Sequence, residues 1–247
     1  MKHFVALLAV ACLLAGCRGL RPDRAPTEPR VFPCRRLQGS ITLDGRPDEP
    51  AWERAHFITD FRHPVSGARP QAPTGARFLW DDEYLYVAAV MKDRDVYALK
   101  TEHDAKTWED DACELFLKPS DAEPAYFEVH VTPLGTTLDL LIARRGAGAF
   151  ERWTPWESGL RAEAEVQGTL NDWSDEDRAW TIEAALPWKG FRPAASRPQL
   201  GDRWRVAVNR YNYSVHLEAG RELSSSARLT SPSFHHYEDY DYLEFVD

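Results

Sequence analysis

The chain of 247 residues is 43% hydrophobic and 28% charged, which excludes global disorder and allows one large domain or two small ones. Its formal net charge of −9 argues against a nucleic-acid partner, which needs clustered Lys and Arg, and against electrostatic docking to anionic lipid. Aromatic residues make up 12% of the chain, and such side chains either fill β-sheet cores or form flat apolar platforms for ligands.

The first residues, 1–16, have the organisation of a secretory signal peptide. Lys2 precedes an apolar run at residues 4–14 that is too short to span a bilayer. The run ends in Leu14-Ala-Gly-Cys17, which resembles a bacterial lipobox, so we expect cleavage after residue 16 and lipidation of Cys17. The alternative is an ordinary signal peptide with a fortuitous cysteine.

Residues 17–30 are expected to form the lipidated end and a flexible tether. Residues 18–30 contain three prolines and four arginines without apolar periodicity. Arg18 follows the cysteine, and by resemblance to enteric lipoproteins the absence of Asp there points away from retention at the inner membrane. We therefore expect an exported protein that is lipid-anchored to a bacterial membrane, the outer membrane in a Gram-negative cell, with one folded domain at residues 31–247.

From residue 31 onward, short segments with alternating or β-rich composition are separated by turn signals. We expect strands at residues 77–80, 84–90, 113–117, 126–131, 137–143, 160–166, 180–186, 204–209 and 240–245. One short helix is expected near residues 50–55, with a proline early in it. About ten strands predict an all-β fold, an antiparallel β-sandwich of the jelly-roll or immunoglobulin-like type.

Two cysteines remain in the folded part, Cys34 and Cys113. An oxidising compartment would allow them to form a disulfide, which we expect. The alternative is a pair of buried free thiols, which behave as small hydrophobic groups.

Three segments together resemble the family 9 carbohydrate-binding modules and their lipoprotein relatives. They are Asp44-Gly-Arg-Pro-Asp-Glu-Pro-Ala-Trp52, Leu79-Trp-Asp-Asp-Glu-Tyr-Leu-Tyr-Val87 and Trp108-Glu-Asp-Asp-Ala-Cys-Glu-Leu-Phe116. The resemblance covers residues 31–247 and implies a β-sandwich that binds sugars without catalysis, often with structural calcium. No organic cofactor is expected.

The third segment supplies the candidate ligand-binding residues. Trp108 precedes a strand and is expected at the rim, where an indole can stack on the apolar face of a pyranose ring. The resemblance makes Trp108 the stacking platform, Glu114 an acceptor for sugar hydroxyls and Asn209 an amide that holds them. Asp111 is a further candidate acceptor. Each also has a structural interpretation: Trp108 as a core aromatic, Asp111 as a turn cap or calcium ligand, Glu114 as a solvent-facing strand residue, and Asn209 as a partner for buried backbone.

The chain departs from the family pattern in two places. The loop expected at residues 221–232 has no second tryptophan, with Ala227 near the matching position, and Glu128 stands where the family has an arginine. Arg210 is the expected replacement for that cation. A second wall is expected from Tyr211, Tyr213, or Phe234 with His235.

Other functions compete with reversible sugar binding. Asp110, Asp111 and Glu114 come from one short segment, which disfavours glycoside hydrolysis because that chemistry places two carboxylates across a cleft. A second alternative is a haem-binding sandwich, which would need axial ligands such as Met91. A third is a scaffold, which is a domain of this fold that has lost its sugar site. Oxygen ligands that suit calcium are plentiful at residues 93–95 and 172–177, but neither stretch has a recognised spacing, so no calcium ligand is assigned. The expected partners are mono- or oligosaccharides or a polysaccharide, with a glycoside hydrolase or transporter as a neighbour, in carbohydrate catabolism.

Overall fold

The computed structural model describes residues 27–192 and 194–247. The expected signal peptide, Cys17 and most of the expected tether lie outside the described residues. The strands are β1 (Val31–Arg36), β2 (Thr74–Trp80), β3 (Tyr84–Lys92), β4 (Ala112–Lys118), β5 (Tyr126–Val131), β6 (Thr137–Ile142), β7 (Arg161–Gln167), β8 (Ala179–Pro187), β9 (Arg203–Tyr213), β10 (Arg221–Ser225) and β11 (Asp241–Val246). The helical segments are short: α1 (Pro50–Glu53), η1 (Thr107–Glu109), η2 (Phe150–Arg152), η3 (Trp188–Phe191) and η4 (Tyr237–Asp239).

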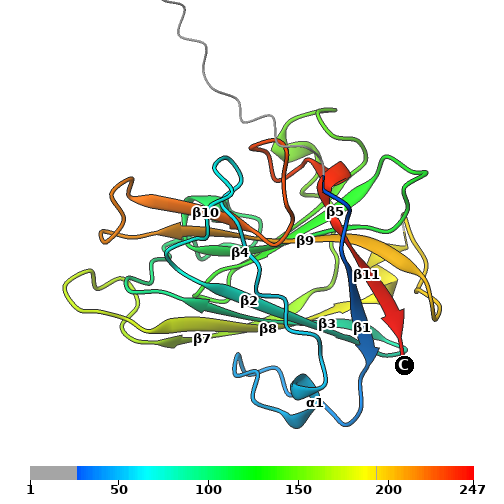
Figure 1. Ribbon diagram of the computed structural model, residues 1–247, viewed down its shortest axis with the longest axis horizontal. Helices are drawn as coiled ribbons and strands as arrows, with labels where there is room; N and C mark the ends of the chain where they lie inside the picture. Colours follow the sequence, from blue (N-terminus) through cyan, green and yellow to red (C-terminus); the bar gives the residue numbers. More distant parts are fainter. Residues whose placement is uncertain (1–26, 193) are drawn as a thin grey trace, which may run out of the picture.

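The strands form one hydrogen-bonded sheet that folds over into two layers. Its order is β6-β5-β4-β9-β11-β1-β2-β3-β8-β7, and β10 pairs with the far end of β9. In Figure 1, β4, β5, β9 and β10 form one layer, β2, β3, β7 and β8 form the other, and β1 with β11 joins them. The all-β sandwich predicted from the sequence is confirmed. Its pairing is antiparallel except around β1, which runs parallel to both β11 and β2.

The main core lies between the layers and follows from the period-two alternation of the strands. On β4, Cys113, Leu115 and Leu117 are buried in this core, and on β5 it receives Phe127 and Val129. Because successive side chains in a strand point to opposite faces, the alternate residues of β4 and β5 face away from the main core. A second hydrophobic cluster forms on that opposite face, and it includes Phe116, Tyr126, Leu140, Ala207 and Phe234.

The two cysteines are free thiols buried in the main core, so the predicted disulfide is not formed. Strands β9 and β11 lie between β4 and β1 in the sheet, whereas a disulfide needs Cα atoms within about 7 Å. Burial raises the pKa of Cys113 to about 12, and it also raises the pKa of Cys34. Both thiols therefore act as small hydrophobic groups.

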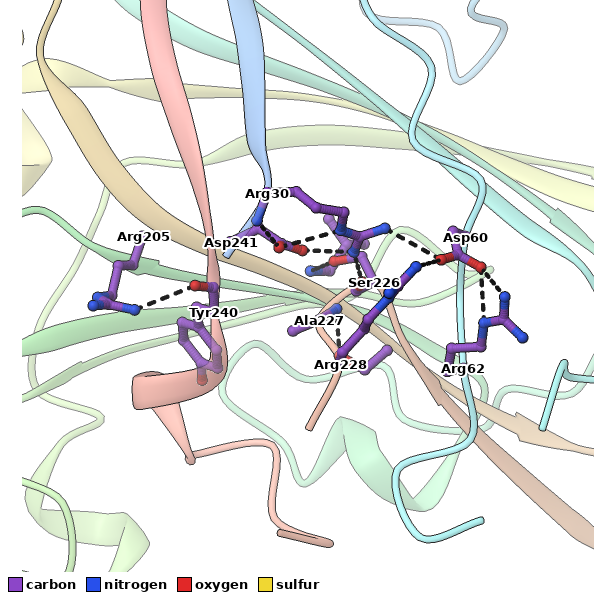
Figure 2. A network of polar contacts seen from close by, with 11 residues as sticks. Arg30, Asp60, Arg62, Arg205, Ser226, Ala227, Arg228, Tyr240 and Asp241 are labelled. Atoms are coloured by element: carbon purple, nitrogen blue, oxygen red, sulfur yellow. Dashed lines mark hydrogen bonds and ion pairs between the residues drawn. The ribbon is translucent and has the colours of Figure 1, made fainter. Parts of the chain in front are cut away.

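A charged network fixes the start of the folded domain (Figure 2). The backbone N–H and the guanidinium of Arg30 both donate to the carboxylate of Asp241, at 2.7 Å and 2.6 Å, and the same guanidinium donates to the carbonyl of Ser226. Asp60 lies beside this pair and contacts Arg30, Arg62 and Arg228. The chain is thereby attached to β11 one residue before β1 begins. Among the described residues no helix is long and apolar enough to cross a membrane.

Candidate functional site

A pocket of about 540 Å³ lies on the face of β4, β5 and β6 that points away from the main core. Its floor comes from these strands and β9. Its walls come from η1 and from the two long loops that follow β6 and β10. The pocket is lined by Trp108, Glu114, Phe116, Tyr126, Glu128, Leu140, Ile142, Arg145, Gly146, Gly148, Phe150, Trp153, Tyr211, Leu223, Pro232, Ser233, Phe234 and His235.

Aromatic rings form much of the wall. Trp108 is half-buried, and its ring meets Phe150 edge to face with centroids 5.0 Å apart. Tyr211 meets Phe234 in the same way at 5.6 Å. Such pairs fix ring orientations, so the indole of Trp108 is held at the pocket rather than left to rotate freely. Trp153 contributes a further ring from the loop between β6 and β7.

Three buried ionisable side chains lie together on the floor. The Nε2 atom of His130 is 2.9 Å from Oε1 of Glu128 and 3.2 Å from Oε1 of Glu114, and its Nδ1 is 2.8 Å from Oγ1 of Thr107. Burial raises the pKa of Glu114 to about 8. Burial acts to lower the pKa of His130, but the two carboxylates outweigh it and raise that pKa above its usual value. The cluster therefore retains protons near neutral pH.

The same floor contains polar atoms with no hydrogen-bond partner in the protein. They are Oε2 of Glu114, Oε2 of Glu128, and both Oδ1 and Nδ2 of Asn209. All three residues are at most 4% exposed. Asn209 is the register partner of Glu114 across β4 and β9, so its amide is next to the floor although it is not itself among the lining residues. A buried polar group without a partner costs about 1–3 kcal/mol, which a ligand with hydroxyl groups would recover.

A cation that sequence reasoning missed also lines the pocket. The guanidinium of Arg145 makes a bidentate pair with Glu238, with both N–O distances 2.7 Å, and donates to the carbonyl of His235 at 3.0 Å. It also stacks over the ring of Tyr237 at 4.5 Å. These contacts hold a planar positive group at the wall. Nothing in the sequence around Arg145 signals this role, because the loop has no periodic pattern.

Two of the predicted site residues lie elsewhere. Both carboxylate oxygens of Asp111 accept backbone N–H groups, from Tyr97 at 2.8 Å and from Tyr213 at 2.6 Å. Arg210 forms a fully buried ion pair with Asp93 at 2.6 Å. Neither Asp111 nor Arg210 lines the pocket, and both predictions are corrected to structural roles. Arg210 lies outside the pocket because it follows Asn209 in β9, and successive side chains of a strand point to opposite faces.

Some of the other residues named from the sequence line the pocket, and others do not. The residues among them that line the pocket are Trp108, Glu114, Tyr211, Phe234 and His235. Tyr213 does not line it; its hydroxyl donates to the carbonyl of Trp108 at 2.8 Å and so supports the platform from behind. Ala227, near which the family's second tryptophan would fall, is buried in the second hydrophobic cluster and does not line the pocket. Phe150 and Trp153 supply aromatic walls that the sequence did not indicate.

Three carboxylates of the acidic stretches at residues 93–95 and 172–177 are already engaged within the protein. Asp93 is paired with Arg210, and Oδ2 of Asp95 accepts the N–H of Val215 at 2.7 Å. Both oxygens of Asp177 accept backbone N–H groups, from Thr169 and Val96. Carboxylates already engaged in this way do not offer the six to eight free oxygen ligands that calcium needs.

The chain spans only a small part of the curated relatives that it matches. It is 29% identical over 90 residues to endo-1,4-beta-xylanase A of Thermotoga maritima, a match that covers 36% of this chain and 8% of the xylanase. It is 38% identical over 82 residues to endo-1,4-beta-xylanase C of Paenibacillus barcinonensis, covering 33% of this chain and 7% of that enzyme.

Solved structures share the fold at low sequence identity. A Bacteroides uniformis protein provisionally assigned to carbohydrate binding superposes with a TM-score of 0.65 at 14% identity, covering 88% of this chain and all of that one. A family 9 carbohydrate-binding module of Caldicellulosiruptor kristjanssonii, solved with cellotriose, gives 0.56 at 14% identity over 88% and 94% of the two chains. The same kind of module with glucose gives 0.53 at 14% identity over 86% and 95%.

The sequence model described as carbohydrate family 9 binding domain-like matches residues 43–202. This stretch includes η1, which carries Trp108, and the strands β4 and β5, which carry Glu114 and Glu128, and it ends before β9. The resemblance noted in the sequence is confirmed: the chain belongs to the carbohydrate family 9 binding domain-like family.

Proposed function

We propose that the protein is a non-catalytic binding domain that takes a sugar residue into the pocket beside Trp108. The observation that carries this proposal is the group of unpartnered polar atoms on Glu114, Glu128 and Asn209 at an aromatic-walled pocket. The cellotriose and glucose bound by the structurally similar modules support the ligand class.

The chemistry of the pocket matches the two faces of a pyranose. An indole stacks on the CH-rich face of the ring, and equatorial hydroxyls both donate and accept hydrogen bonds. In this proposal Glu128 accepts from hydroxyls, Glu114 accepts and, when protonated, also donates, and the amide of Asn209 both donates and accepts. Arg145 donates from the wall formed by the loop after β6. With one main platform and a few polar contacts, the Kd is expected to be on the order of micromolar to millimolar.

The arrangement of the carboxylates favours binding over hydrolysis. Glu114 and Glu128 both approach the same nitrogen of His130, so they lie side by side on the floor. A glycosidase instead needs two carboxylates that flank the scissile bond. We therefore place any hydrolysis in a neighbouring enzyme. The proposal includes anchoring through lipidated Cys17, so that the domain captures sugar chains at the cell surface for degradation or uptake.

The test is a titration of the full chain carrying Cys17→Ser, which blocks lipidation. Tryptophan fluorescence and calorimetry would follow the addition of glucose, cellobiose, cellotriose and xylotriose, with a galactose control. We expect a saturable response, and a loss of affinity of at least about tenfold in Trp108→Ala. The matched control is Trp173→Ala, because Trp173 is 70% exposed and does not line the pocket.

The outcomes separate sugar binding from the scaffold alternative. Binding that survives Trp108→Ala would show that the sugar site is elsewhere. A flat response to every sugar, from protein with normal circular dichroism, would reject the proposal and favour a domain that has lost its sugar site.

A further inference from the structure

A second group of ionisable side chains lies outside the pocket, at the start of β6. It consists of His103, Asp104 and Asp139, each of which places one ligand atom within 4.8 Å of the other two. None of the three lines the pocket. They come from two segments, the loop that leads to η1 and strand β6.

The imidazole of His103 has a defined orientation. Its Nδ1 is 3.0 Å from the backbone carbonyl of Thr137 and 3.0 Å from the hydroxyl of the same residue. A carbonyl oxygen only accepts, so Nδ1 carries the hydrogen. In the neutral ring Nε2 then has a free lone pair, and this atom is 3.5 Å from Oδ1 of Asp104 and 3.4 Å from Oε2 of Glu157. Two carboxylates that face this nitrogen are compensated either by a proton on Nε2 or by a metal cation bound to its lone pair.

Asp139 supplies the buried ligand. It is 1% exposed, and Oδ2 accepts the backbone N–H of Ser158 at 2.9 Å and the hydroxyl of the same residue. Its Oδ1 has no hydrogen-bond partner in the protein. An ionised oxygen buried in this way is costly unless a cation compensates it. The bonds from Ser158 orient the carboxylate, which is the role of outer-shell groups at metal sites.

Asp104 adopts an unusual backbone conformation that helps to place its carboxylate. Its φ is +60°, and among non-glycine residues it shares a positive φ only with Asn171 in the described part of the chain. Such a conformation costs about 1–3 kcal/mol and persists where surrounding contacts impose it. The N–H of Asp104 donates to the carbonyl of Thr137 at 3.0 Å, and its Oδ1 accepts the N–H of Asp139 at 3.3 Å.

We propose that His103, Asp104 and Asp139 bind a divalent transition-metal ion of the Zn²⁺ type, with Glu157 or water as the fourth ligand. The ligand set of one imidazole and carboxylates suits Zn²⁺ better than calcium, which takes oxygen ligands alone. The Nε2–oxygen separations of 3.4–3.5 Å are close to the ligand–ligand separation of about 3.3 Å expected around tetrahedral zinc. The hydrogen bond from Nδ1 to a carbonyl is the usual second contact of a zinc-bound histidine.

Such an ion would join segments that carry the walls of the pocket. His103 and Asp104 precede Trp108 in the same connection, and Glu157 lies in the loop between β6 and β7 that also carries Phe150 and Trp153. The ion would therefore cross-link both aromatic walls to β6 from behind, which would stabilise the folded domain.

The test measures zinc directly and does not depend on sugar binding. The full chain with Cys17→Ser, freed of metal by chelation and dialysis, would be titrated with Zn²⁺ against a zinc-sensitive dye, and Tm would be measured with and without the ion. We expect one site per chain, a higher Tm with Zn²⁺, and a loss of affinity of at least about tenfold in His103→Gln and in Asp104→Asn. Asparagine tolerates the positive φ of Asp104, so the second variant changes the charge with little strain.

Two comparison variants make the result decisive. His216→Gln removes a histidine outside both ionisable clusters and should leave Zn²⁺ affinity unchanged. His130→Gln tests the other cluster, formed by Glu114, Glu128 and His130. The proposal is overturned if the wild type does not bind Zn²⁺, or if binding survives His103→Gln and Asp104→Asn and is lost in His130→Gln.

Discussion

Glu114 on β4 and Asn209 on β9 are direct cross-strand partners, and together they present three buried polar atoms that have no partner in the protein. We therefore predict that a substitution at Asn209 will lower sugar affinity without a matching loss of folding stability. In Asn209→Ala we expect sugar affinity to fall at least about tenfold, because both amide contacts are lost. The free energy of unfolding should change by less than about 1 kcal/mol, since removing two unsatisfied groups offsets the small cavity. Calorimetry and urea unfolding would measure the two effects, and a large loss of stability would contradict this assignment of Asn209.

A second prediction concerns Arg145, in the pocket wall formed by the loop after β6. Arg145→Ala should weaken sugar binding about tenfold, because a charged donor to the ligand is worth about 1.5–3 kcal/mol at most. Glu238→Gln should weaken it less, since Arg145 keeps its bond to the carbonyl of His235. Arg144→Ala is the matched control, because Arg144 is the exposed neighbour and does not line the pocket. Equal effects of the two arginine substitutions would mean that only net charge matters.

The buried cluster of Glu114, Glu128 and His130 predicts that the free energy of unfolding decreases as pH rises. The pKa of Glu114 is raised to about 8 and that of His130 is raised, so the folded state binds more protons than the unfolded state between about pH 4.5 and 8. The groups that face His130 are Glu114, Glu128 and Thr107, and His235 lies 3.7 Å from Glu128. The free energy of unfolding should fall across this window, by up to about 1.4 kcal/mol per pH unit for each proton.

Glu114→Gln is the control for that pH dependence. The variant keeps the shape of the side chain but cannot ionise, so its stability should vary less with pH from about 5 to 8 than that of the wild type. Chemical unfolding at several pH values would measure both curves. Parallel curves for the two proteins would show that the protons are bound elsewhere.

Substitution of Arg210 is predicted to lower folding stability strongly and to leave sugar affinity unchanged. Arg210→Met leaves the carboxylate of Asp93 buried without its partner, which should cost about 3–5 kcal/mol. The folded fraction should bind sugar with unchanged affinity, since Arg210 does not line the pocket. Arg203→Met is the control, because the pair of Arg203 with Glu244 is exposed and should be worth less than about 1 kcal/mol. Loss of sugar affinity in folded Arg210→Met would support the ligand-binding role that the sequence first suggested for Arg210.

Much of the fold was predictable because the alternation of apolar and polar residues in β4 and β5 indicates which side chains face the core. The same rule shows why Asn209 and Arg210 do not both reach one pocket, since neighbours in a strand face opposite sides. Strand β1 was missed because it contains Pro33, which cannot donate to a ladder, and it is stabilised by pairing with distant β11. Strand β10 was missed because its serine-rich sequence resembles a loop.

The site was less predictable because it depends on register and on loop packing. The sequence places Glu128 and His130 on one face of β5, but only the pairing of Glu114 with His130 brings the three ionisable groups together. Phe150 and Trp153 come from a loop without periodicity, and its course over β6 is set by tertiary contacts. No local pattern reports such contacts.

The attachment of Arg30 to Asp241 also determines how the domain would bear mechanical load. Tension on the chain ahead of Arg30 meets the ion pair first and then β1, whose parallel partner β11 is in turn paired with β9. Force directed along β1 would shear its hydrogen bonds to β11 together, and would not unzip them one at a time. If the chain is anchored ahead of Arg30 and a sugar polymer is bound in the pocket, as proposed, the load between them would pass through β1, β11 and β9. The sheet would then resist the pull, and the loops would not.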